Sequence, residues 1–305
     1  MLLQIDNLIK LYLHVCDKYR KEIGLAVQRF SNNGLQGAIS DEELITIYLF
    51  CVAYEEKYKI KSMYHHIKTY WISWFPTLPS YQTFNDRLNR LCDAFIPLMV
   101  DFFNAVNVPT DSLTIIVGDS FPVVTCSAKR GGKVARELTA KGFCSSKGLH
   151  YYGVKIHAIA LRQPKQLPFP QYFDMTPACV HDLSAIRNVL QKIDADASLF
   201  DKAYCDVELE KEMQKNNNTL ITPLKDKKGW QAILQQKEQA FTDLFNKAVS
   251  TLRQPIESLF NWINELTSIQ KASKVRSEKG LKLHVFGKLT AAMMIITSRP
   301  SKSHF

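Results

Sequence analysis

Residues 113–119, LTIIVGD, and residues 197–201, ASLFD, decide the fold of this chain. Each is a short apolar run that ends in an aspartate, which predicts a buried strand with a carboxylate at its carboxyl end. Alternating apolar and polar residues predict two more strands at 151–162 and 171–177, and TLITPL predicts a fifth at 219–224.

Helical patterns precede the last two strands, at 182–193, where Asp182 is a suitable N-cap, and at 206–215. Strands without helices between them usually form a meander, and strands that follow a helix arrive by a crossover. The sequence therefore predicts an α/β fold with a mixed five-stranded sheet flanked by helices. Its first and fourth strands are expected to be neighbours, which would bring Asp119 and Asp201 together.

The chain before the sheet has a different character, because residues 1–107 have helical patterns throughout. Ser40 and Glu43 form a capping-box pattern, and further helices are predicted at 61–71 and 80–103. We therefore expect a helical N-terminal domain at 1–107, a catalytic domain at 108–298 and a short tail at 299–305.

The helix predicted to start at Ser80 has a polar and basic beginning that includes Gln82, Arg87 and Arg90. Three helices with such a third helix suit a helix-turn-helix, whose recognition helix contacts bases with its first turns. An ordinary three-helix bundle with a polar surface would show the same pattern, so both interpretations stay open.

Composition narrows the class of protein. The chain of 305 residues has 39 Lys and Arg against 29 Asp and Glu. Such a basic excess attracts polyanions, usually nucleic acid, although it would also be attracted to an anionic membrane surface.

The seven cysteines are odd in number and form no C-x-x-C pair, which argues against a disulfide framework or zinc module and indicates a cytoplasmic protein. No apolar stretch is expected to span a membrane, and residues 289–298 are expected to form a packed helix.

Paired carboxylates are the candidate catalytic groups. Two aspartates at adjacent strand ends repel each other unless a cation lies between them, and Mg²⁺ or Mn²⁺ takes oxygen ligands of this kind. Either aspartate alone could instead occupy a turn or cap the next helix.

A third carboxylate, Glu257, lies beside an apolar stripe at helical spacing that is expected to pack on the sheet. Pro255 should lie close to a helix start or produce a kink, and Arg253 is one turn before Glu257, so a plain surface Arg–Glu pair is the alternative. Three carboxylates that hold two metal ions would catalyse in-line displacement at a phosphodiester.

Basic residues surround these carboxylates in the sequence. A segment that directly follows Asp119 is rich in cations that could contact phosphate, and its members include Lys129, Arg130, Lys133, Arg136, Lys141 and Lys155. Lys202 adjoins Asp201, and aromatic residues such as Phe143 in the same segment could stack on unpaired bases. A solvated charged loop is the alternative explanation.

The order of these motifs resembles that of bacterial insertion-sequence transposases, and most closely the 982-type insertion-sequence family. The resemblance covers roughly residues 110–295. It rests on GDSFPV (118–123), GLHYYGVKIH (148–157), the pair His181–Asp182, DKAY (201–204) and the R-x-x-x-E motif that starts at Arg253.

The resemblance implies an RNase H-like catalytic domain whose DDE triad and metal ligands are Asp119, Asp201 and Glu257. It implies two Mg²⁺ or Mn²⁺ ions, cleavage or strand transfer at the ends of a DNA element, and a role for Arg253 in contacting DNA or supporting Glu257. Double-stranded DNA would be the partner, in a homodimer or larger complex, within the bacterial cytoplasm and on the nucleoid when DNA is bound.

Two positions depart from related groups, which place a Tyr and a Lys where this chain has Ser250 and Asn264, so no DNA contact is assigned to either. His157 could face the site but is expected to be structural, and His181 could support Asp119. Two other functions stay open, namely a sequence-specific DNA-binding relative without activity and an RNase H-fold nuclease that never joins strands.

Overall fold

The structure is a computed structural model that describes residues 2–27, 38–105, 113–128, 132–144, 148–224 and 232–298. The chain divides into two compact units. Residues 108–132 and 138–262 form what we call the sheet unit, and residues 1–107, 133–137 and 263–305 form the helical unit.

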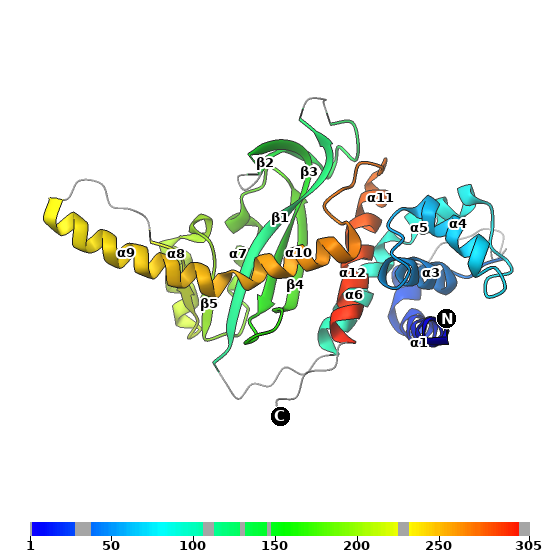
Figure 1. Ribbon diagram of the computed structural model, residues 1–305, viewed down its shortest axis with the longest axis horizontal. Helices are drawn as coiled ribbons and strands as arrows, with labels where there is room; N and C mark the ends of the chain where they lie inside the picture. Colours follow the sequence, from blue (N-terminus) through cyan, green and yellow to red (C-terminus); the bar gives the residue numbers. More distant parts are fainter. Residues whose placement is uncertain are drawn as a thin grey trace. The chain divides into compact units, whose positions relative to one another are not determined.

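The sheet unit contains one six-stranded mixed sheet (Figure 1). Its strands are β1 (Ile115–Ser127), β2 (Ala140–Cys144), β3 (Leu149–Leu161), β4 (Phe169–Pro177), β5 (Ala197–Leu199) and β6 (Thr219–Ile221). β3 pairs antiparallel with β1 on one edge and with β2 and then β4 on the other. β5 pairs parallel with β1, and β6 pairs parallel with β5. The predicted meander followed by crossovers is therefore present.

The first strand is longer than its apolar run suggests. The sequence predicts a strand that ends at Asp119, whereas β1 continues to Ser127 and places Asp119 inside the strand. The continuation contains Pro122, which is paired with Lys155 of β3 in register. β5 ends at Leu199, level with Val117, so within the described residues β1 pairs beyond this point with β3 alone.

The sheet has one strand more than the predicted five, because β2 has no sequence signature of its own. Its five residues, AKGFC, lack a regular apolar alternation, and Lys141 and Phe143 are exposed. β2 is defined by its pairing with the first residues of β3 and not by burial of one face.

Helices cover the sheet and connect its later strands. The crossovers are α7 (Asp182–Leu190) and α8 (Val207–Lys215), and the helices that follow the last strand are α9 (Ala232–Arg253) and α10 (Pro255–Thr267). α10 begins at Pro255, as expected for a proline in the first helical turn. Its apolar stripe packs on β1, where the rings of Phe260 and Phe121 lie 4.7 Å apart. This packing fixes the position of Glu257 relative to β1.

The helical unit consists of helices only, within the described residues. Its elements are α1 (Leu2–Lys18), η1 (Tyr19–Ile23), α2 (Gly24–Ala26), α3 (Asp41–Ala53), α4 (Ile60–Tyr70), α5 (Tyr81–Arg90), η2 (Cys92–Ala94), α6 (Phe95–Asn104), α11 (Glu278–Lys282), η5 (Leu283–Gly287) and α12 (Lys288–Thr297). The predicted capping box is confirmed, since the Ser40 side chain accepts from the Glu43 amide and the Glu43 carboxylate accepts from the Ser40 amide.

The C-terminal segment belongs to this helical unit, whereas the sequence places it in the catalytic domain at 108–298. Thr290 of α12 donates a 2.8 Å hydrogen bond to the Phe95 carbonyl of α6, and the Tyr48 hydroxyl of α3 donates to the Leu283 carbonyl. Apolar side chains of α12 are buried against these helices. Local sequence patterns do not reveal such long-range packing.

The helix predicted at 80–103 is broken into α5, η2 and α6. α5 starts at the Ser80 N-cap, as expected, but it ends at Arg90 and a short 3-10 turn precedes α6. Gln82 and Arg90 are exposed on α5. Arg87 is instead engaged within the unit, because its guanidinium donates to Asp41 at 2.6 Å and to the Ile39 carbonyl.

One helical stretch, Glu278–Thr297, is long and apolar enough to cross a membrane, contrary to the expectation that no stretch approaches that length. In the described structure 67% of its apolar window is buried inside the protein. The buried helix of a soluble core passes the same test of length and composition. The expected packing of 289–298 agrees with the burial of Leu289 through Met294.

Gly118 gives a test of this packing, because a Cβ at this position would lie 2.1 Å from Cε1 of the buried Phe200 ring. We expect Gly118→Ala to lower the free energy of unfolding by about 1–3 kcal/mol, as measured by urea denaturation. Phe200→Leu removes the obstructing ring, so the double variant should be more stable than the sum of the two single changes predicts. Strict additivity would show that the two residues do not oppose each other.

Candidate active site

Asp119 lies on β1, and Asp201 lies two residues beyond the end of β5, the strand that pairs parallel with β1. The β1–β5 register pairs Ile115 with Ala197 and Val117 with Leu199, so the same offset aligns position 119 with position 201. The backbone at Asp201 is still extended, with φ of −76° and ψ of 169°. Because neighbouring strands lie about 4.8 Å apart and residues in register face the same side, the fold brings the two carboxylates together.

Arg253, the last residue of α9, connects Asp119 with Glu257. Its Nη1 donates to Asp119 Oδ2 at 2.7 Å, and its Nη2 lies 3.7 Å from Glu257 Oε1. The Arg253 side chain is 14% exposed, whereas that of Glu257 is 58% exposed. The predicted Arg–Glu pair on one helix face is therefore present, but the same guanidinium also reaches a strand that is 134 residues away in sequence.

The Asp119 carboxyl is held in an unfavourable environment for its charge. Burial raises its pKa above the usual value, and the negative charge of Asp201 acts in the same direction. Arg253 and the Ser120 amide, which donates to Asp119 Oδ1 at 2.8 Å, counteract this increase without cancelling it. The site thus keeps a like-charge pair that one guanidinium only partly neutralises.

Tyr204 lies beneath these carboxylates. It ends the short turn η4 (Lys202–Tyr204), and its ring lies 4.8 Å from that of Phe200. Burial raises the pKa of its hydroxyl, and the charges of Asp182, Asp119 and Asp201 raise it further. Its hydroxyl is buried and has no hydrogen-bond partner among the described residues, so a neutral O–H remains available beside the acidic groups.

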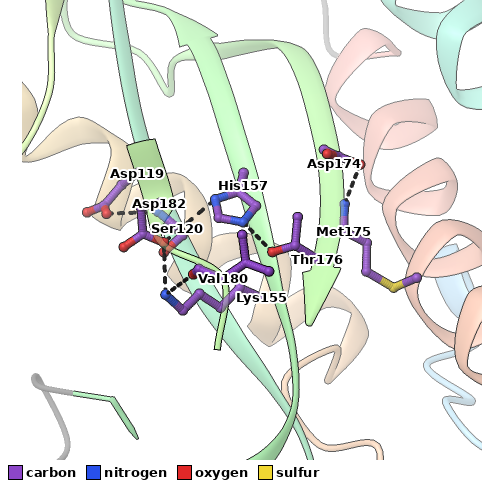
Figure 2. A network of polar contacts seen from close by, with 9 residues as sticks. All are labelled: Asp119, Ser120, Lys155, His157, Asp174, Met175, Thr176, Val180 and Asp182. Carbon is purple, nitrogen blue, oxygen red and sulfur yellow. Dashed lines mark hydrogen bonds and ion pairs between the residues drawn. The ribbon is translucent and has the colours of Figure 1, made fainter. Parts of the chain in front are cut away.

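Asp182 is the centre of a polar network on the other face of β1 (Figure 2). Side chains alternate along a strand, so Asp119 faces α9 and α10 while Ser120 faces α7. Asp182 Oδ1 accepts from the Ser120 hydroxyl at 2.9 Å and from Lys155 Nζ at 3.1 Å. Lys155 also donates to the Val180 carbonyl at 3.0 Å. The network therefore joins β1, β3 and the start of α7 next to Asp119.

The predicted N-cap of α7 is off by one residue. The N-cap is His181, which makes no side-chain capping bond, and Asp182 is the first helical residue. The Asp182 carboxylate does not cap the helix. It points toward the sheet, where it accepts hydrogen bonds from Lys155 and Ser120.

The two histidines have different surroundings. His157 is fully buried, and its Nε2 shares a 2.7 Å hydrogen bond with Thr176 Oγ1. Its Nδ1 lies 3.7 Å from Asp182 Oδ1, and burial lowers the pKa of the ring. These contacts agree with the expected structural role. His181 is exposed.

Apart from Arg253, described above, the predicted DNA-binding residues fall into three groups. Lys202 is exposed beside Asp201, Lys141 is exposed on β2, and Lys155 points into the Asp182 network. Lys133 and Arg136 are exposed on a loop that belongs to the helical unit. Gln82, Arg87 and Arg90 belong to the same unit but lie on α5. Lys129 and Arg130 lie outside the described residues.

Sequence patterns alone did not identify Ser120, Thr176 or Tyr204 as parts of the site, nor Asp182 as the centre of a network. One signal was present, because strand alternation places Lys155 and His157 on the same face of β3, and Ser120 pairs with His157. Two polar side chains on one face of a buried strand require polar partners. Lys155 and His157 therefore indicate that polar residues such as Asp182 and Thr176 lie opposite them.

A family model described as a transposase DDE domain matches residues 110–278, more than half of the chain. The chain belongs to this DDE transposase family. The matched segment contains both aspartates, Arg253 and Glu257. Neither the curated proteins nor the solved structures gave a match. Family membership gives the chain a mixed α/β catalytic domain with nuclease and transposase chemistry.

DDE transposase domains generally use divalent metal ions, and the carboxylates fit such a group. The donors are all oxygens, and a cation beside Asp119 would offset the burial and the charge of Asp201, which together raise the Asp119 pKa. Among the described residues no set of three or more His, Cys, Asp or Glu side chains is already gathered around one point. Glu257 is joined to Asp119 through Arg253 instead.

Asp119→Asn should change how stability depends on pH when divalent metal is removed with EDTA. A carboxyl whose pKa is raised on folding contributes stability below its unfolded pKa and loses it as pH rises through the folded pKa. The variant cannot ionise, so its melting temperature relative to wild type should rise between about pH 4 and neutral pH. The exposed Asp243 on α9 provides the control Asp243→Asn. A constant difference across this range would contradict the strained carboxylate.

Proposed function

We propose that this chain is an insertion-sequence transposase that cleaves DNA at the ends of its element and joins those ends to target DNA. Asp119, Asp201 and Glu257 are the proposed catalytic triad. The observation that supports the proposal is the β1–β5 register, which, continued by two residues, brings Asp201 level with Asp119 in a chain of the DDE family. A buried carboxylate that is only partly compensated and has a second carboxylate nearby is a costly arrangement, of the kind that active sites contain.

Each residue has a role in this mechanism. The three carboxylates would hold two divalent ions, Mg²⁺ or Mn²⁺, which activate the attacking water or 3′-hydroxyl and stabilise the leaving oxygen when bound. Arg253 holds Asp119 and Glu257 at a fixed spacing, and its guanidinium can contact a DNA phosphate once the carboxylates have other cationic partners. The neutral Tyr204 hydroxyl can donate a hydrogen bond to an oxygen at the buried side of the site.

The motif order described above supports assignment to the 982-type insertion-sequence family, and with it a bacterial, cytoplasmic protein that associates with the nucleoid when bound to DNA. The exposed Gln82 and Arg90 on α5 would contact the element ends as parts of a helix-turn-helix. Arg87 would first have to leave Asp41 to do so. Lys202, beside Asp201, would contact phosphate close to the site of cleavage. Joining two DNA ends would need a dimer or a larger complex.

The proposal is tested by incubating the protein with a labelled duplex that carries the element ends, with Mn²⁺, Mg²⁺ or EDTA. Wild type should nick the duplex at the ends only with a divalent ion, and it should produce joined products with target DNA. Asp119→Ala, Asp201→Ala and Glu257→Ala should each reduce nicking to background, because each removes a metal ligand. Glu265→Gln, an exposed carboxylate on the same helix as Glu257, is the matched control.

The other outcomes separate the alternatives. Specific binding to the ends without nicking at any metal concentration would identify a DNA-binding relative. Nicking without joined products would identify a nuclease that does not transfer strands. Full activity in any one of the three alanine variants would contradict the assigned triad.

A further inference from the structure

The sheet unit has a second feature, an open cavity of about 440 Å³ between β2, β3 and the loop that precedes α7. Its size is within the range of pockets that hold small organic ligands. Nine residues line it, and they include Lys141, Phe143, His150, Lys155 and His181. No acidic residue is among them, so the lining suits an anionic ligand.

An aromatic pair forms one wall of this cavity. Phe143 of β2 and His150 of β3 are a register pair, with ring centroids 4.7 Å apart and planes inclined by 48°. Phe143 is 53% exposed, which is unusual for a phenylalanine that a strand could bury. An exposed ring of this kind offers a face on which a nucleobase can stack.

Cations lie on both sides of the cavity. Lys141 is exposed and lies in no ion pair with a described residue. Lys155 is oriented by Asp182 and the Val180 carbonyl, so its ammonium has a fixed position. A phosphate beside a stacked base would therefore find an exposed cation and a second cation that Asp182 orients and partly compensates.

The walls of the cavity are held close together at Gly142. A Cβ at this position would lie 2.7 Å from both the Cβ and the carbonyl oxygen of Ala178. β2 therefore packs directly against the backbone of the loop that carries Cys179 and His181. This packing gives the cavity a defined base, in contrast to a gap between mobile side chains.

The cavity is connected to the proposed catalytic site. Lys155 lines the cavity and pairs in register with Pro122, three residues along β1 from Asp119. At a strand rise of about 3.3 Å per residue, this is roughly 10 Å. Asp182 also joins Lys155 to Ser120, the neighbour of Asp119. The cavity and Asp119 are therefore close along the same pair of strands, although Lys155 and Asp119 project from opposite faces of the sheet.

We propose that this cavity binds one unpaired nucleotide of the DNA on which the protein acts, an inference that rests on the proposed function. Phe143 stacks on the base, and Lys141 and Lys155 contact the flanking phosphates. A base within a duplex has both faces covered by its neighbours, so only an unpaired or extruded base can use the ring. Cations alone would serve intact duplex equally well and would not need an exposed phenylalanine.

Binding of the full-length protein to two fluorescein-labelled probes in EDTA tests this inference. The probes are a twelve-nucleotide oligothymidylate and a blunt duplex, and fluorescence anisotropy gives the Kd for each. Phe143→Ala should weaken oligothymidylate binding by about 10-fold, the effect of one lost base stack. Duplex binding should change by less than about twofold, because its bases cannot reach the ring.

Two further variants make the result specific. Phe143→Trp keeps a stacking surface and should bind oligothymidylate as wild type does, with quenching of the new tryptophan fluorescence. Phe241→Ala removes another exposed phenylalanine, which lies on α9 outside the cavity, and should leave both affinities unchanged. Wild-type binding by Phe143→Ala, or an equal loss on both probes, would overturn the inference, and so would a Phe143→Trp variant that binds as weakly as Phe143→Ala.

The design separates this inference from the proposed function because no cleavage is measured and no metal is present. A selective effect of Phe143→Ala together with absent nicking would refute the catalytic proposal and leave the nucleotide site intact. Normal metal-dependent nicking with unchanged oligothymidylate binding in Phe143→Ala would refute the nucleotide site alone.

Discussion

Parallel pairing of β1 with β5 is the constraint on which the candidate active site depends. β5 has three residues, and its register with β1 determines whether Asp201 lies level with Asp119 or one pleat away. A slip of one residue would turn one carboxylate to the opposite face of the sheet. Gly118 and the buried Phe200 follow the last paired residues, Val117 and Leu199, and directly precede the two aspartates. The Phe200 ring packs closely on Gly118, and this contact helps to fix the register of β5 on β1.

The energetic cost of the site arises from the same geometry. Asp119 is only a quarter exposed and lies near a second carboxylate, and both conditions disfavour its charged form. Arg253 compensates in part and also lies beside Glu257, so a single guanidinium contacts two of the three acidic groups. The buried charge of Asp119 lowers the stability of the fold when no cation is bound. A bound cation would offset this cost, so metal binding should stabilise the folded protein.

Local patterns predicted much of this structure, since the strands that flank Asp119 and Asp201, the start of α10 at Pro255 and the Ser40 capping box all have short-range signatures. Long-range relations were not predictable in the same way. β2 has no apolar alternation, and β1 continues through Pro122 because β3 supports it along its whole length. The Asp182 network joins residues 62 positions apart, and the Arg253–Asp119 pair joins residues 134 positions apart. Such contacts follow from packing, which one sequence does not reveal.

Metal-specific rescue of Asp201→Cys is the most direct test of the central claim that Asp119 and Asp201 bind a divalent ion. Mg²⁺ strongly prefers oxygen ligands, whereas Mn²⁺ tolerates sulfur better, so a ligand position changes its metal preference when a thiolate replaces the carboxylate. We expect Asp201→Cys to be inactive in nicking with Mg²⁺ and to regain activity with Mn²⁺, while wild type uses both ions. Activity of Asp201→Cys with Mg²⁺ equal to that of wild type would contradict a ligand role for Asp201.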